Sequence, residues 1–330
     1  MANLICNAQS LANEIIKTDL ISDLFHFEAS KVSKYWKSNM ILLFKNLIIK
    51  EAQINDKDLL KIVDFLCETF NIMESEGFSL ENAIEGLYQI VENSENEDLK
   101  QYIFKSIKSD IFLLIIEKNY NIEDSIEFFF NFAFCYSVWL SKSSSKNYFL
   151  YDFAQACLKL IDKNKNLKYI KETLKLMQKI IEEKGYPFIK FLLEDQKFYN
   201  FIFFLSHNKD EINAYTNMFY IYFCNQVSKF PDLLDTLIDS EFIHHILERI
   251  NNLEMENQDS IYGYLVTFFN ILEENLKNRK FINLLLKASR YTKLNDKMSQ
   301  IASQHSGNPT IIEIANLIID RINKLFKSIE

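Results

Sequence analysis

The stretch Leu265–Leu272 reads LVTFFNIL and places a side-chain amide, Asn270, directly after a run of apolar residues. Phe128–Phe130 precede Asn131 in the same way, and Tyr222–Cys224 precede Asn225. Amides in or beside apolar runs recur along the chain at Asn46, Gln89, Asn131, Gln178, Asn225, Asn270 and Asn316. The steps between them are 43, 42, 47, 47, 45 and 46 residues. A repeat of this length, carried on helices, predicts an all-α fold, a solenoid of about seven units.

Composition supports a helical chain. Only 5 Gly and 3 Pro occur in 330 residues, and these are the residues that turns and sheet proteins need most. With 48% hydrophobic residues and 29 Phe, the chain has ample material for a continuous core. Asn55, Asn166, Gly185 with Pro187, and Pro309 stand where helices are predicted to start.

The periodicity of apolar residues, together with these helix-start residues, predicts fifteen helices. Their ranges are 8–25, 28–50, 56–74, 79–93, 97–118, 122–141, 147–163, 166–184, 187–206, 209–229, 231–253, 257–277, 278–290, 292–304 and 309–328. Each repeat is predicted to hold a shorter helix or pair, then a longer helix that carries the amide. Because no connection is long enough for a linker, we expect a single helical-repeat domain over 1–330. In it, 1–28 forms the amino-terminal cap and 309–328 the last repeat helix.

The net charge indicates the class of partner, and the positions of the cysteines indicate the cellular location. A net charge of −8 lacks the general attraction to phosphate that nucleic-acid binding needs, so we expect a protein partner and no nucleic acid. No membrane span is predicted, because the longest uncharged stretch holds several Asn and Thr residues. Cys6, Cys67, Cys135, Cys157 and Cys224 lie in apolar helical runs without paired spacing. They indicate reduced core thiols and a cytoplasmic or nuclear location.

The segment Leu233–Glu274 resembles an armadillo repeat, and weaker copies cover most of the chain. The resemblance rests on Leu237, Ile238, Phe242, Ile246 and Leu247, followed by Ile261, Leu265, Phe268, Phe269, Asn270, Ile271 and Leu272. It implies a right-handed superhelix whose third helices line a concave groove. It also implies that the seven amides, as donors and acceptors, bind the backbone of an extended ligand. Aromatic residues on the expected groove stripe are Phe44, Tyr88, Phe128, Tyr222 and Phe269, for which a core role is the favoured interpretation.

Two features depart from the nuclear-import adaptors of this superfamily. Those adaptors carry a Trp four residues before the Asn, whereas the positions here hold Leu42, Glu85, Glu127, Leu174, Ile221, Val266 and Ile312. The glycine that bends the first helix against the second is also missing from most repeats, which favours HEAT-like hairpins. The amides have a second interpretation, in which they bond to a neighbouring repeat and set the stacking register.

Residue patterns for catalysis or metal binding are absent from the sequence. It contains no Gly-rich phosphate loop, no Cys-x-x-Cys or His-Glu-x-x-His spacing and no Gly-x-Ser-x-Gly elbow. His244 and Glu248 form an i, i+4 pair, which is more simply explained as a helix surface. The acidic cluster from Glu92 to Asp98 is interpreted as a solvated turn. We therefore expect no enzyme, no catalytic or metal-binding residue and no cofactor.

Two functions remain open at this point. The first is a non-catalytic scaffold or adaptor that binds an extended peptide along the groove. The second is a regulatory subunit, or an activation or exchange factor, for a GTPase or kinase, which predicts a globular partner. An all-α enzyme is a distant third. Neither the partner nor the oligomeric state follows from the sequence.

Overall fold

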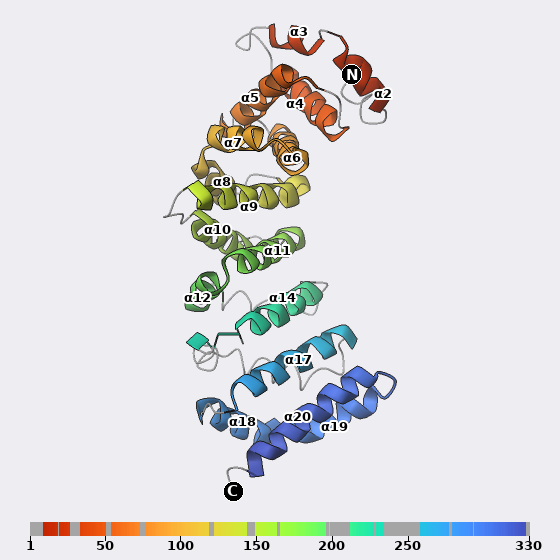
Figure 1. Ribbon diagram of the computed structural model, residues 1–330, viewed down its shortest axis with the longest axis vertical. Helices are drawn as coiled ribbons and strands as arrows, with labels where there is room; N and C mark the ends of the chain where they lie inside the picture. Colours follow the sequence, from red (N-terminus) through yellow and green to blue (C-terminus); the bar gives the residue numbers. More distant parts are fainter. Residues whose placement is uncertain are drawn as a thin grey trace. The chain divides into compact units, whose positions relative to one another are not determined.

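The computed structural model describes residues 9–18, 20–26, 34–50, 54–72, 77–118, 122–143, 149–163, 166–195, 198, 212–227, 229–230, 232–233, 258–276, 279–292 and 294–327. Regular structure in these residues is entirely helical, with sixteen α-helices and one 3-10 helix (Figure 1). The all-α prediction is confirmed for this part of the chain. None of the helices searched within it is long and apolar enough to cross a membrane.

The chain divides into two compact units, Met1–Leu176 and Met177–Glu330, here the amino-terminal and carboxy-terminal units. The prediction that one repeat domain spans residues 1–330 stays a prediction. The amino-terminal unit holds α2 (Gln9–Ile16), α3 (Leu20–His26), α4 (Lys34–Ile49), α5 (Asp56–Ile72), α6 (Gly77–Asn93), α7 (Glu97–Ser106), α8 (Ser109–Glu117), η2 (Glu123–Ser125), α9 (Ile126–Ser143), α10 (Phe149–Lys163) and the start of α11 (Leu167–Lys184). The carboxy-terminal unit holds α12 (Tyr186–Glu194), α14 (Ile212–Val227), α17 (Gln258–Glu274), α18 (Arg279–Thr292), α19 (Leu294–Gln304) and α20 (Pro309–Lys327).

The seven amides lie on α4, α6, α9, α11, α14, α17 and α20, which we call the amide helices. In the amino-terminal unit α4 packs on α6 and α6 on α9, although α5 lies between the first two in sequence and α7 and α8 between the second two. In the carboxy-terminal unit α14 packs on α17 and α17 on α20. The amide helices α4, α6 and α9 are therefore successive neighbours in one unit, and α14, α17 and α20 in the other (Figure 1).

Aromatic side chains fill the core of the amino-terminal unit. Phe112 of α8 is fully buried, and its ring lies 5.1 Å from that of Phe70 on α5 and 5.7 Å from that of Phe129 on α9. It also contacts Phe149 and Phe153 of α10. One ring thus joins elements of three consecutive predicted repeats. In the carboxy-terminal unit the corresponding group is smaller among the described residues, with Phe198 packed against Phe219 and Phe223.

Several predicted helix starts are confirmed. The side chain of Asn55 accepts the N–H of Asp58 at the start of α5, and that of Asn166 accepts the N–H of Lys168 at the start of α11. Gly185 precedes α12 with a positive φ of 58°, and Pro187 lies in the first turn. Such caps satisfy backbone donors that have no partner within the helix.

Three predicted helices are wrong as single elements. The first is 187–206, because α12 ends at Glu194 and Asp195 is extended. The range 97–118 forms α7 and α8, because Ile107 is extended and Asn71 of α5 bridges the break. Nδ2 of Asn71 donates to the carbonyl of Ser106 at 2.7 Å, and its Oδ1 accepts the N–H of Lys108 at 3.1 Å. The range 8–25 forms α2 and α3. The predicted helix 231–253 lies almost wholly outside the described residues.

Candidate functional site

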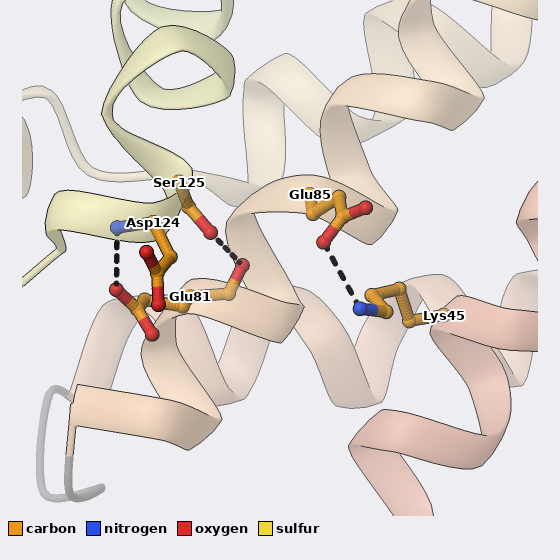
Figure 2. A network of polar contacts seen from close by, with 5 residues as sticks. All are labelled: Lys45, Glu81, Glu85, Asp124 and Ser125. Atoms are coloured by element: carbon orange, nitrogen blue, oxygen red, sulfur yellow. Dashed lines mark hydrogen bonds and ion pairs between the residues drawn. The ribbon is translucent and has the colours of Figure 1, made fainter. Parts of the chain in front are cut away.

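In each unit, the candidate site is the side of the amide helices on which their amides lie, which we call the amide face of that unit. In the amino-terminal unit, charged pairs join neighbouring helices across this face. Nζ of Lys45 on α4 lies 3.0 Å from Oε2 of Glu85 on α6, and both side chains are largely shielded from solvent (Figure 2). The hydroxyls of Ser38 and Ser79 share a hydrogen bond of 2.6 Å between the same two helices.

A second polar junction, also drawn in Figure 2, joins α6 to the start of α9. Oε1 of Glu81 accepts the N–H of Asp124 at 3.2 Å, and the Ser125 hydroxyl donates to the carbonyl of Glu81. Burial raises the pKa of the Glu81 carboxyl above its ordinary value of 4.5. The hydrogen bond from Asp124 and the charge of Lys168 lower this pKa in part, while the Asp124 and Glu123 carboxylates raise it.

Lysines of α11 form ion pairs with a carboxylate of η2 and a carboxylate of α9. Nζ of Lys168 lies 3.7 Å from Asp124, and Nζ of Lys175 lies 3.7 Å from Glu127 on α9. Lys175 also pairs at 2.8 Å with Glu172, a buried carboxylate. The carboxylates that α9 presents on this face are thus engaged by lysines of the next amide helix.

The carboxy-terminal unit uses uncharged contacts at its first junction. Nδ2 of Asn270 on α17 donates to Oδ1 of Asn225 on α14 at 3.3 Å. A Cβ at Gly263 would lie 2.7 Å from Cδ1 of Ile221, so the absence of a side chain there lets the two helices approach closely. Ion pairing appears at the next junction, where Arg321 of α20 pairs with Glu273 of α17.

The seven predicted amides have different surroundings. Asn46 is buried, with 6% of its surface exposed, whereas Asn316 is exposed. Gln89, Asn131, Gln178, Asn225 and Asn270 are half-buried. Gln89 accepts a hydrogen bond from Asn93, and Gln178 donates one to Glu182, each within its own helix. The side chains of Asn225 and Asn270 bond to each other between two amide helices.

The aromatic residues expected near the groove also differ. Phe44 is fully buried, so its core role is confirmed. Tyr88, Phe128, Tyr222 and Phe269 are half-buried, and the rings of Tyr88 and Phe128 lie 5.8 Å apart across α6 and α9. Burial and the neighbouring Glu182 raise the pKa of the Tyr222 hydroxyl to about 12. These rings contribute to the repeat junctions and still present an edge to solvent.

Sequence reasoning missed the residues that join one repeat to the next. Asn71, Glu81 and the Lys45–Glu85 pair had no assigned role, although Glu85 occupies the position four before an amide. A search for complementary charges about 40 residues apart would have found the Lys45–Glu85 pair, whose separation is 40. No sequence signal identifies Asn71, because its partners are backbone groups.

Two kinds of reactive group, possible metal ligands and cysteine thiols, can be followed in the described residues. Within the described ranges no group of three or more His, Cys, Asp or Glu is arranged to hold a metal ion. Cys67, Cys157 and Cys224 are buried, Cys135 is half-buried, and all four are free thiols. Burial and nearby Asp64 raise the pKa of the Cys67 thiol to about 12, which makes it a poor nucleophile near neutral pH. His244 and Glu248 lie outside the described residues.

No protein-family model matches this chain, and no curated protein matches its sequence.

Proposed function

We propose that the chain is a right-handed α-solenoid of about seven armadillo/HEAT-like repeats. It acts as a non-catalytic scaffold or adaptor that binds another protein on its amide face. The cysteines fit a cytoplasmic or nuclear location, because buried thiols without disulfides suit a reducing compartment.

The observation that carries this proposal is the recurrence of contacts between residues 40–46 positions apart in both units. Lys45 and Glu85 are 40 residues apart, and Ser125 and Glu81 are 44 apart. In the carboxy-terminal unit Asn270 and Asn225 are 45 apart. Tyr186 of α12 donates to Asp232, 46 residues away. A chain whose units each contact the next at a nearly constant step is organised as a repeat array.

The amide face supports the binding role because it presents partly exposed polar groups held by hydrogen bonds, together with exposed apolar side chains. Gln89 and Gln178 are held by bonds within their own helices, and Asn225 and Asn270 by a bond between two helices, which lowers the entropy lost when a ligand binds. Met218 of α14 is 67% exposed and Tyr262 of α17 is 41% exposed. Exposed aromatic and Met side chains are frequent anchors in protein interfaces.

Photo-crosslinking tests this function. A crosslinking amino acid replaces Tyr262 on the amide face or, as the matched control, Tyr102 on α7; these tyrosines are 41% and 40% exposed. We expect a protein from the native cell to be captured at position 262 and not at 102. Purified partner should then compete with the adduct. Capture at both positions alike, or at 102 alone, contradicts the proposal.

The nature of the captured protein separates the two functional hypotheses. Crosslinks confined to a short segment of the partner support an adaptor that binds an extended peptide. A folded GTPase or kinase whose turnover changes on binding supports the regulatory alternative instead.

A further inference from the structure

We propose that the amide face formed by α14, α17 and the first three turns of α20 binds a basic protein segment that also carries apolar side chains. This inference rests on the protein-binding function proposed above and names the chemistry of the partner for one region of that surface.

The distribution of charge is the first argument. Helix α14 (INAYTNMFYIYFCNQV) contains no charged residue, and α17 (QDSIYGYLVTFFNILEE) contains acidic residues but no Lys or Arg. In α20 the acidic Glu313 and Asp320 precede the first basic residue, Arg321. Lys and Arg make up 37 of the 330 residues, and neither α14 nor α17 contains one, so the charged side chains of these two helices are all acidic.

The second argument is which carboxylates remain available. Glu273 is paired with Arg321, and Asp320 with Lys324. Glu274 and Glu313 are exposed and have no side-chain partner in the described part of the chain. Two carboxylates on neighbouring amide helices are therefore available to Lys or Arg side chains of a partner.

The apolar part of the partner follows from the exposed apolar and aromatic side chains of α14, α17 and α20. Met218 and Tyr262 are 67% and 41% exposed, and Leu317 of α20 is 40% exposed. Close approach of α14 and α17 at Ile221 and Gly263 brings the helices that carry Met218 and Tyr262 together. Met adapts its shape to an apolar partner, and Tyr adds a large contact area.

In the amino-terminal unit three carboxylates are already paired with lysines of a neighbouring amide helix. There Glu85, Asp124 and Glu127 are each within 3.7 Å of a lysine of the neighbouring amide helix. A basic segment would have to displace these lysines. We therefore assign the basic ligand to the carboxy-terminal unit.

Fluorescence anisotropy with three labelled twelve-residue peptides tests the inference on the full chain. The first repeats Lys-Lys-Val-Val, so that each side of an extended peptide presents both residue types. The others replace Lys with Ser or with Glu. We expect the Lys peptide to bind most tightly, about tenfold better than the Ser peptide, and to weaken as salt is raised. The Glu peptide should bind least.

The double variant Glu274→Lys with Glu313→Lys should weaken the Lys peptide about tenfold. The control Glu68→Lys with Glu117→Lys changes net charge equally at exposed positions of α5 and α8, and should leave affinity unchanged. Equal binding of the three peptides, no binding of any, or equal effects of both double variants overturns the inference. If crosslinking at position 262 still captures acidic or uncharged segments, the protein-binding function stands without it.

Discussion

The junctions of the amino-terminal unit and the α14–α17 junction of the carboxy-terminal unit join amide helices with different chemistry. In the amino-terminal unit, ion pairs such as Lys45–Glu85 and Lys175–Glu127 link successive helices, and aromatic rings fill the space behind them. In the carboxy-terminal unit, α14 and α17 meet through the Asn225–Asn270 amide bond and a glycine contact. A similar sequence spacing is therefore compatible with two kinds of junction. In one, carboxylates pair with lysines of the next amide helix; in the other, uncharged groups join the helices and carboxylates stay exposed.

The largest effect is expected from Phe112→Ala, because its ring contacts aromatic residues from three predicted repeats and is fully buried. Removing a buried Phe lowers the free energy of unfolding by about 3–5 kcal/mol. Hydrogen exchange should show lost protection in residues 9–176 and little change in residues 177–327. Phe112→Leu is the milder control. Equal loss of protection in both units would show that their stabilities are not separable.

Asn71→Ala should have the next largest effect. It removes the donor to Ser106 and the acceptor for Lys108, so both backbone groups at the α7–α8 break lose their partner. We expect the free energy of unfolding to fall by about 1–3 kcal/mol in chemical denaturation. Asn71→Asp keeps the acceptor and loses the donor, so it should lie between wild type and Asn71→Ala. A stable Asn71→Ala protein with unchanged exchange at residues 106–109 contradicts this role.

Double-mutant cycles compare the two kinds of junction directly. For the partly buried Lys45–Glu85 pair, the cycle built from Lys45→Met and Glu85→Gln should give a coupling energy of about 1 kcal/mol that falls as salt is raised. For Asn225→Ala and Asn270→Ala we expect about 0.5–1 kcal/mol with no salt dependence. Similar salt dependence in both cycles would remove the distinction between the two kinds of junction.

The smallest effect concerns Glu81 and pH. Burial raises the folded-state pKa of its carboxyl above 4.5, so the fold favours the protonated form. Its contribution to stability is therefore present at low pH and is lost as pH rises from 4.5 through the folded pKa. Glu81→Gln keeps an acceptor for the Asp124 N–H and removes the charge. Its Tm should exceed that of wild type at neutral pH, and the difference should vanish below pH 4.5. A constant difference across this range contradicts the assignment.

Much of the local structure follows from particular residues. Few Gly and Pro, apolar helical periodicity and caps such as Asn55 and Asn166 were enough to predict the all-α fold and most helix starts. The amide spacing predicted that helices about 45 residues apart hold equivalent positions in successive repeats. The division of 97–118 into two helices could not be predicted, since the break is held by Asn71, which lies outside that range.

The candidate site was predicted in outline only. Sequence spacing identified the amide helices, but it gave all seven amides the same role. The structure distinguishes them, because burial and partners depend on how closely neighbouring helices approach. Gly263 illustrates this, since its importance comes from the position of Ile221 on another helix.

By itself, the sequence determined that the chain is helical, where most helices begin and which of them carry the amides. These properties depend on backbone propensity, capping and short-range periodicity, all of which act within a few residues. Only the tertiary structure decided which carboxylates are paired with lysine and which are exposed. Two residues about 45 positions apart interact through space, and whether their side chains meet depends on the packing of the helices between them.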